Sequence, residues 1–154
     1  MSDLLVPLFG LPPGMEIPGV WIGKPLPHQS PLVLSHVSEE YGTGWEAEVR
    51  TAFTTVPPKI FIAADQDTGS LLGFCCWDCT ALGFLGPIGV STEYKGRGIG
   101  KALVQSTLHS MAEHGYAYAI IGDAGPVEFF QQCCDARIIA GSDPGIYGNP
   151  FGKG

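Results

Sequence analysis

Charged side chains are scarce in this sequence, and basic ones are the scarcest: eight Lys and Arg stand against fifteen Asp and Glu. The net charge of −7 argues against a general nucleic-acid-binding protein, and it suits a basic or amine substrate. No apolar run approaches the roughly 18 residues of a membrane helix, and no basic segment precedes the first apolar residues. We therefore expect one globular cytoplasmic domain, 1–154, with no membrane or nucleic-acid partner.

A disulfide framework is also missing. The five cysteines are an odd number in two clusters: Cys75, Cys76, Cys79, Cys133 and Cys134. Cys76 and Cys79 have the spacing of a zinc or redox motif, but on a strand their side chains would point to opposite faces. We expect reduced, buried thiols and no metal site.

The stretch 84–112 has the strongest functional signal. Its apolar start, 84–90, predicts a buried strand, and a polar link leads to three glycines at alternate positions. The glycines are Gly96, Gly98 and Gly100. Apolar residues then recur at helical spacing until Gly115, a natural helix stop. These residues are Leu103, Val104, Leu108 and Met111, together with Thr107.

Such a strand, loop and helix can bind an anion. The first N–H groups of a helix lack intrahelical partners and lie at its positive end, and glycines let phosphate oxygens approach them. Lys95, Arg97 and Lys101 place three of the eight basic residues within seven positions. In an acidic chain, this concentration of positive charge predicts a phosphate-binding loop.

Two other phosphate-binding loops fit less well. A Walker A loop needs Ser or Thr after Gly-Lys and an earlier glycine, but Ala102 and Lys95 occupy these positions. A dinucleotide-binding loop needs Gly-x-Gly-x-x-Gly directly after a strand, and the spacing here is Gly-x-Gly-x-Gly after a polar link. A nucleotide-binding protein and a glycine-rich turn without a ligand stay as alternatives.

The segment 95–100, Lys-Gly-Arg-Gly-Ile-Gly, resembles the Q/R-x-x-G-x-G/A signature of the GNAT superfamily of acyl-CoA N-acyltransferases. Lys95 stands where the signature has Gln or Arg. Lysine keeps the positive charge of Arg but lacks its planar guanidinium group. The resemblance runs over roughly 59–147. It implies acetyl-CoA as cosubstrate and direct acetyl transfer to a primary amine, either a small molecule or an exposed amino group of a peptide.

The resemblance also implies a fold that agrees with the local patterns. We expect an α/β protein with a mixed, largely antiparallel sheet and helices on both faces. Residues 1–19 should form an irregular Pro/Gly-rich arm on the same domain or on a neighbouring subunit, which makes a homodimer possible. Helices are expected at 31–37, 45–53, 127–134 and from the glycine loop to Gly115, and strands at 20–24, 59–65, 70–79, 84–90, 116–122, 137–140 and from 146.

In the family, the strand before the loop diverges from the next parallel strand, and the pantetheine arm of acetyl-CoA lies in the gap. The resemblance therefore implies a cofactor site of backbone groups on that strand, loop amides and residues beyond the next strand. The implied residues are Ile88, Gly89, Val90, Lys95, Gly96, Arg97, Gly98, Ile99, Gly100, Lys101, Asp123 and Phe130.

The sequence departs from the family at the usual general acid. Many members have Phe-Tyr where this chain has Phe129-Phe130, and Asn where it has Asp123. Three explanations are open: the CoA thiolate leaves unaided, another residue reaches the sulfur, or the protein is an acyl-CoA-binding sensor without catalysis.

The catalytic assignments that we make are Tyr118 as the replacement acid, with Tyr116 and Tyr147 as alternatives, and Asp78 as the general base. Asp78 is chosen because it follows the strand 70–79 and lies close to the start of the strand 84–90, where the acceptor should enter. An ordinary strand-end carboxylate is the alternative interpretation of Asp78.

Overall fold

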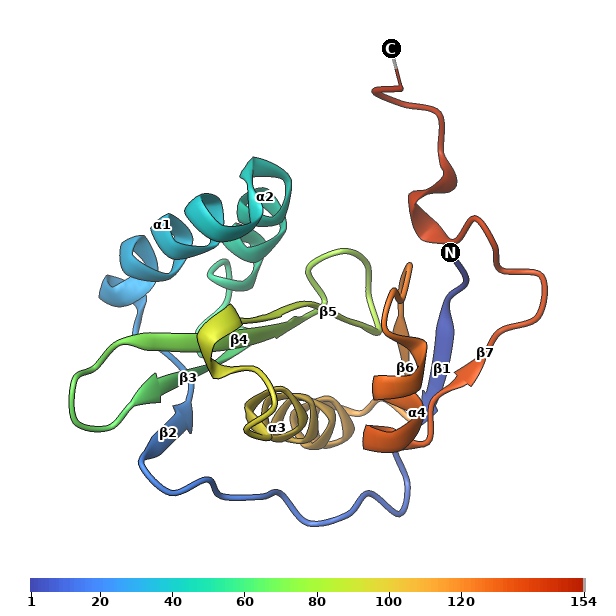
Figure 1. Cartoon of the computed structure of the whole chain (residues 1–154). Helices are drawn as coiled ribbons and strands as arrows, with labels where there is room; N and C mark the ends of the chain where they lie inside the picture. Colours follow the sequence, from blue (N-terminus) through green and yellow to red (C-terminus); the bar gives the residue numbers. More distant parts are fainter. Residues whose placement is uncertain (154) are drawn as a thin grey trace.

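The computed structural model describes residues 1–153 as a seven-stranded sheet with helices on both faces (Figure 1). The strand order is β2-β3-β4-β5-β6-β1-β7, and each neighbouring pair is antiparallel except the parallel pair β5 and β6. This arrangement confirms the expected α/β fold. The elements are β1 (Leu4–Pro7), β2 (Val20–Gly23), α1 (Ser30–Tyr41), α2 (Thr43–Ala52), β3 (Ile60–Asp65), β4 (Leu71–Trp77), β5 (Phe84–Val90), α3 (Ile99–His114), β6 (Tyr118–Ile121), α4 (Val127–Cys134) and β7 (Arg137–Ile138), with short 3-10 helices η1 (Pro27–Gln29), η2 (Thr92–Tyr94) and η3 (Ile146–Gly148).

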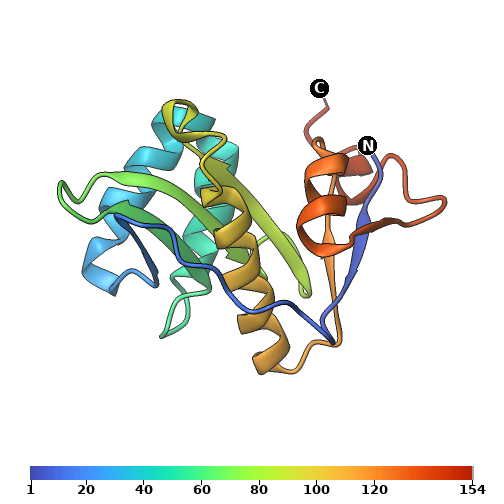
Figure 2. The same ribbon diagram turned by 60° about the horizontal axis from the view of Figure 1, so that its bottom comes forward.

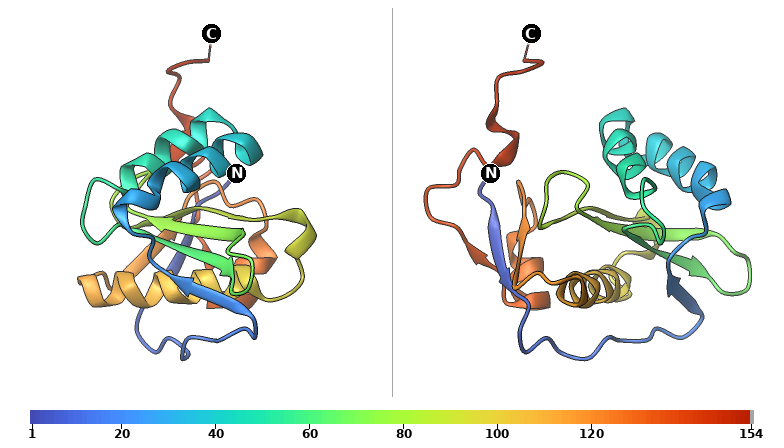
Figure 3. Two further views of the ribbon diagram at one scale, coloured as in Figure 1. Left: turned by 90° about the vertical axis from the view of Figure 1, so that its left-hand side faces the viewer. Right: turned by 180° about the vertical axis from the view of Figure 1, so that it is seen from behind.

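Two hydrophobic clusters hold the layers together. One lies under α1 and α2 and packs Val37 and Val49 against Phe74 of β4. The other joins α3 and α4 to the opposite face of the sheet, with Leu103 and Phe130 among its members. Figure 3 shows the sheet edge-on, with α1 and α2 on one side and α3 on the other. Strand β4 is buried on both faces, which explains its continuous apolar sequence.

Helix α3 follows the pattern of its sequence. The apolar residues at helical spacing are all buried, and the helix ends at Gly115 in a left-handed conformation with φ of 118°. Glycine takes this conformation without the steric cost that a Cβ brings. Within residues 1–153, no helix is both long and apolar enough to cross a membrane.

The N-terminal residues correct one expectation. Residues Leu4–Pro7 are not an irregular arm but form β1, an inner strand between β6 and β7. Four residues that end in a proline carry too little periodicity to identify a strand, and both partners of β1 are more than a hundred positions away. Residues 8–19 are irregular as expected, and they run across α3 (Figure 3), where the Pro12 carbonyl lies 2.7 Å from His109 Nε2.

We expect Leu4→Ala to lower the free energy of unfolding by about 3 kcal/mol, because it opens a cavity at a fully buried position of an inner strand. Urea unfolding followed by circular dichroism measures the change. Leu5→Ala is the matched control, since Leu5 is only partly buried. Equal effects of the two substitutions would contradict the alternation of buried and partly exposed side chains along β1.

The sheet divides between β5 and β6. The two strands pair at Phe84 with Ile120 and at Leu85 with Ile121, and no pairing follows. Figure 2 shows the strands close together at one end and separating toward the other. From Gly86 to Val90, β5 therefore has β4 as its neighbour on one edge and no strand on the other.

The C-terminal residues correct a second expectation. The strand predicted from Ile146 onward is absent, and Ile146–Gly148 form the 3-10 helix η3. Gly145 has a φ of 81°, which turns the chain out of an extended path before Tyr147. Tyr147 thereby reaches the space between β5 and β6 and does not extend the sheet.

Candidate functional site

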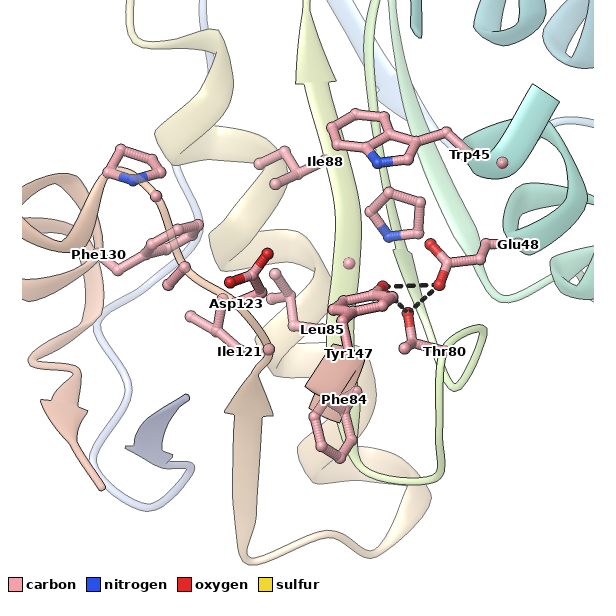
Figure 4. A pocket seen from close by; sticks show the side chains of 17 residues that line it. Trp45, Glu48, Thr80, Phe84, Leu85, Ile88, Ile121, Asp123, Phe130 and Tyr147 are labelled. Carbon is pink, nitrogen blue, oxygen red and sulfur yellow. Dashed lines mark hydrogen bonds between the residues drawn. The ribbon is translucent and has the colours of Figure 1, made fainter. Parts of the chain in front are cut away.

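A pocket of about 470 Å³ lies where β5 and β6 separate. This volume is within the range of small-molecule sites in proteins. Its walls come from β5, from the residues after β6, from α2 and from η3, and Figure 4 shows their side chains. The lining is mainly apolar, with residues such as Trp45, Phe84, Pro87, Ile88 and Phe130.

The unpaired edge of β5 borders this pocket. Leu85 is paired, but Gly86, Pro87 and Ile88 line the pocket beyond the last β5–β6 pair. Such an edge offers backbone N–H and C=O groups to an extended ligand, as a further strand would use them. Gly89 packs on the opposite face, where a Cβ would lie 2.5 Å from Tyr41 Cζ.

The glycine loop lies beyond the end of β5. Gly96 and Gly98 have φ of 82° and 83°, a conformation that side chains rarely adopt, and Gly98 is the N-cap of α3. Gly100 has no such strain, and a Cβ there would be 3.6 Å from Val90 Cγ2 and 3.4 Å from Phe129 Cζ. The loop therefore faces the gap between the end of β5 and α4.

The basic side chains of the loop are exposed. Lys95, Arg97 and Lys101 surround the start of α3, and the Arg97 guanidinium carbon lies 5.6 Å from the centre of the Tyr94 ring. Together with the positive end of a 16-residue helix, these charges make an electropositive site on an acidic protein.

Asp123 and Phe130, both predicted from the sequence, line the pocket with Ile88. Asp123 has a φ of 48°, and its N–H donates a hydrogen bond to Asp3 Oδ1 at 3.0 Å. Its carboxylate lies 3.1 Å from the terminal ammonium of Met1. Phe130 is 3% exposed and presents a ring without a hydroxyl group.

Asp78 lies outside the pocket lining, in a polar network beside the first residue of β5. Its side chain is 2% exposed and pairs with Lys59 Nζ at 3.1 Å. It accepts further hydrogen bonds from Gly83 N–H at 2.7 Å and from the Tyr116 hydroxyl at 2.9 Å. Burial and the hydrogen bond to Asp78 raise the pKa of Tyr116. These contacts support a structural role for Asp78.

Tyr118 is also outside the pocket lining. It is the first residue of β6, whereas the pocket begins at Ile121, the last residue of that strand. Its ring is 48% exposed and packs edge-to-face on Phe9, with 5.6 Å between ring centres. The geometry gives no support to Tyr118 as the acid.

Two residues that the sequence analysis did not assign, Glu48 and Thr80, meet Tyr147, one of the alternative acids, on one wall of the pocket (Figure 4). Glu48 Oε1 accepts hydrogen bonds from Tyr147 Oη at 2.7 Å and from Thr80 Oγ1 at 3.1 Å. Burial and the bond to Glu48 raise the pKa of Tyr147 to about 12. No sequence signal could have found Glu48 and Thr80, because α2, the β4–β5 loop and η3 meet only in the folded chain.

The cysteine side chains lie mostly in the core. All five are free thiols, and four of them are buried. Burial raises the pKa of Cys75 to about 12, so this thiol stays protonated. Among the described residues, 1–153, no group of three or more His, Cys, Asp or Glu side chains could hold a metal ion.

Several solved structures have the same fold. A GCN5-related N-acetyltransferase from Sphaerobacter thermophilus has a TM-score of 0.71 and 20% identity, covering 90% of this chain and 48% of its own. A glucosamine N-acetyltransferase region of a fungal β-N-acetylglucosaminidase has a TM-score of 0.71 and 13% identity, covering 90% and 19%. A Trypanosoma brucei acetyltransferase has a TM-score of 0.55 and 17% identity, covering 73% and 89%.

The first two of these proteins are at least twice as long as the matched region, since this chain spans 48% and 19% of them. At these identities the likeness establishes the fold. No curated protein sequence matches the chain. The sequence profile of the Acetyltransferase (GNAT) family matches residues 30–134, more than half of the chain. The protein therefore belongs to the GNAT family of acetyltransferases.

Proposed function

We propose that the protein is an N-acetyltransferase that moves an acetyl group from acetyl-CoA directly to a primary amine. The observation that carries this proposal is the unpaired edge of β5 beside a pocket, in line with a glycine loop at the start of α3. The β5 edge offers backbone groups to an extended chain. The glycine loop offers amides and positive charge to phosphates.

The residues at the β5 edge and at the glycine loop both fit acetyl-CoA. Backbone groups of Ile88, Gly89 and Val90 would hold the pantetheine arm along β5, while Asp123 and Phe130 border it from the side of β6. Amides and side chains of 95–101 would hold the pyrophosphate, and Gly100 places no side chain between Val90 and Phe129. When bound, acetyl-CoA supplies a thioester carbonyl that a neutral amine can attack.

The pocket offers the groups that such an attack requires. A backbone N–H on the unpaired edge of β5 would stabilise the negative charge that develops on the carbonyl oxygen. Phe130 has no hydroxyl, and Tyr118 lies away from the pocket. Tyr147 is the tyrosine that lines the pocket within residues 1–153, so its hydroxyl replaces the usual acid as the donor nearest to the reaction.

The absent hydroxyl of Phe130 also supports a second candidate, an acyl-CoA sensor without catalysis. Turnover separates the two functions, because only the enzyme releases CoA thiol in the presence of an amine. We further propose that residues 1–154 form one domain, since both hydrophobic clusters pack on a single sheet. The cytoplasmic location and the possible homodimer stay predictions.

Calorimetric titration with acetyl-CoA, with NAD and ATP as controls, tests the cofactor. We expect binding of acetyl-CoA with a 1:1 stoichiometry and no binding of NAD. Release of CoA thiol with a panel of amines then tests the reaction. Folded protein that ignores acetyl-CoA would refute both functions, and binding without thiol release would favour the sensor.

A further inference from the structure

We propose that Glu48 binds the ammonium group of the acceptor and takes its proton, and that the acceptor is a small primary amine with an apolar group and no carboxylate. This inference rests on the proposed function and specifies the acceptor side of the same pocket. It concerns the wall formed by Glu48, Thr80 and Tyr147.

Glu48 is a partly buried carboxylate without a counter-ion. Within residues 1–153 it forms no ion pair, although the neighbouring Glu46 pairs with Arg50 at 2.7 Å on the same helix. Both hydrogen bonds to Glu48 go to Oε1, which leaves Oε2 without a protein donor among the described residues. An ionised carboxylate in an apolar pocket is stabilised when a cation joins it.

Thr80 and Tyr147 hold the carboxylate in place from two sides. Tyr147 donates to Oε1, and Thr80 lies 3.1 Å from the same oxygen and 3.2 Å from the Tyr147 hydroxyl. Figure 4 shows Glu48 reaching from α2 toward this pair in front of β5. The carboxylate therefore faces the strand along which we place the thioester.

The remaining lining sets the character of the acceptor. The rings of Trp45, Phe84 and Tyr147 and the side chain of Pro87 provide an apolar surface for a hydrocarbon or aromatic group. Among residues 1–153, no Lys, Arg or His lines the pocket, so a carboxylate on the acceptor would find no cation there to pair with. Of the two carboxylates in the lining, Glu48 and Asp123, Glu48 is the one that Thr80 and Tyr147 hold beside these rings.

The proton and electron balance of the reaction assigns Glu48 its role. The acceptor ammonium loses one proton to the Glu48 carboxylate and becomes a neutral amine with a free electron pair. That pair forms the C–N bond to the acetyl carbon, and the electrons of the C–S bond leave with the CoA sulfur. The Tyr147 hydroxyl gives its proton to the sulfur and takes the second nitrogen proton in exchange, and Glu48 returns its proton to water, giving the amide, CoA thiol and one released proton.

Steady-state thiol release from 2-phenylethylamine, compared with phenylalanine as acceptor, tests the inference in wild-type protein and two variants. We expect the wild type to prefer the amine, and Glu48→Gln to lower kcat/KM for it by ~10²-fold or more, the usual worth of a general base. The dissociation constant for acetyl-CoA should not change. Glu46→Gln is the matched control on α2 and should keep wild-type rates, since Glu46 is not part of the pocket lining.

The outcomes separate this inference from the proposed function. An active wild type with an equally active Glu48→Gln variant, or a preference for phenylalanine, would overturn the inference alone. A wild type that binds acetyl-CoA but acetylates no amine would overturn the enzymatic function and the inference with it. Thermal unfolding of each variant shows whether a lost rate comes from lost structure.

Discussion

Gly100→Glu should abolish acetyl-CoA binding while the protein stays folded. Gly100 lies in the first turn of α3, and a side chain there would lie between Val90 and Phe129 at ordinary contact distances. Its backbone is not in the left-handed region, in contrast to Gly98, where any side chain adds strain. Gly100 is therefore the cleaner position for this experiment.

The expected size of the effect follows from charge. Two like charges about 4 Å apart near a protein surface repel by about 4 kcal/mol, which is ~1,000-fold in a dissociation constant. A glutamate at the helix start would also occupy the amides that we assign to the pyrophosphate. Calorimetry should therefore show at least ~100-fold weaker binding, after allowance for movement of the side chain.

Gly100→Gln is the control, because it has nearly the same size without the charge. We expect the Gln variant to bind acetyl-CoA at least about tenfold more tightly than the Glu variant, since bulk alone remains. Circular dichroism and thermal unfolding report whether both variants are folded. A folded Glu variant with normal affinity would place the pyrophosphate somewhere other than this loop.

Asp78→Asn should destabilise the protein without slowing the reaction of the folded fraction. The substitution removes the charge opposite Lys59 and keeps one oxygen to accept from Gly83 and Tyr116. Asparagine also tolerates the left-handed backbone at this position, where φ is 58°. Removing one partner of a buried ion pair costs about 3 kcal/mol or more. The free energy of unfolding, measured in urea, should therefore fall by about that amount.

Lys59→Met is the partner variant for this measurement. The Lys59 ammonium lies over the Trp77 ring at 4.9 Å and its side chain is 22% exposed, so its stem already packs against apolar surface. The double variant should recover part of the loss, because no unpaired charge remains. If Asp78 acted as the base, kcat would instead fall by ~100-fold with little change in unfolding.

The local sequence determined much of the frame of this protein. Strand 84–90, the alternate glycines and the apolar spacing of α3 are local patterns, and they placed β5, the loop and the helix as the structure has them. The strand, the glycines and the helix depend on period and on turn chemistry, which neighbouring residues define. Asp123 and Phe130 were implied by the family resemblance, and they line the pocket with Ile88.

Only the tertiary structure decided the rest. Strand β1 depends on pairing with β6 and β7, and Tyr147 enters the pocket because Gly145 turns the chain away from the sheet. Asp78 and Glu48 are both acidic residues in or beside regular elements, yet one is buried against Lys59 and the other lines the pocket. The chemical role of a carboxylate depends on its burial and partners, and contacts between distant segments set both.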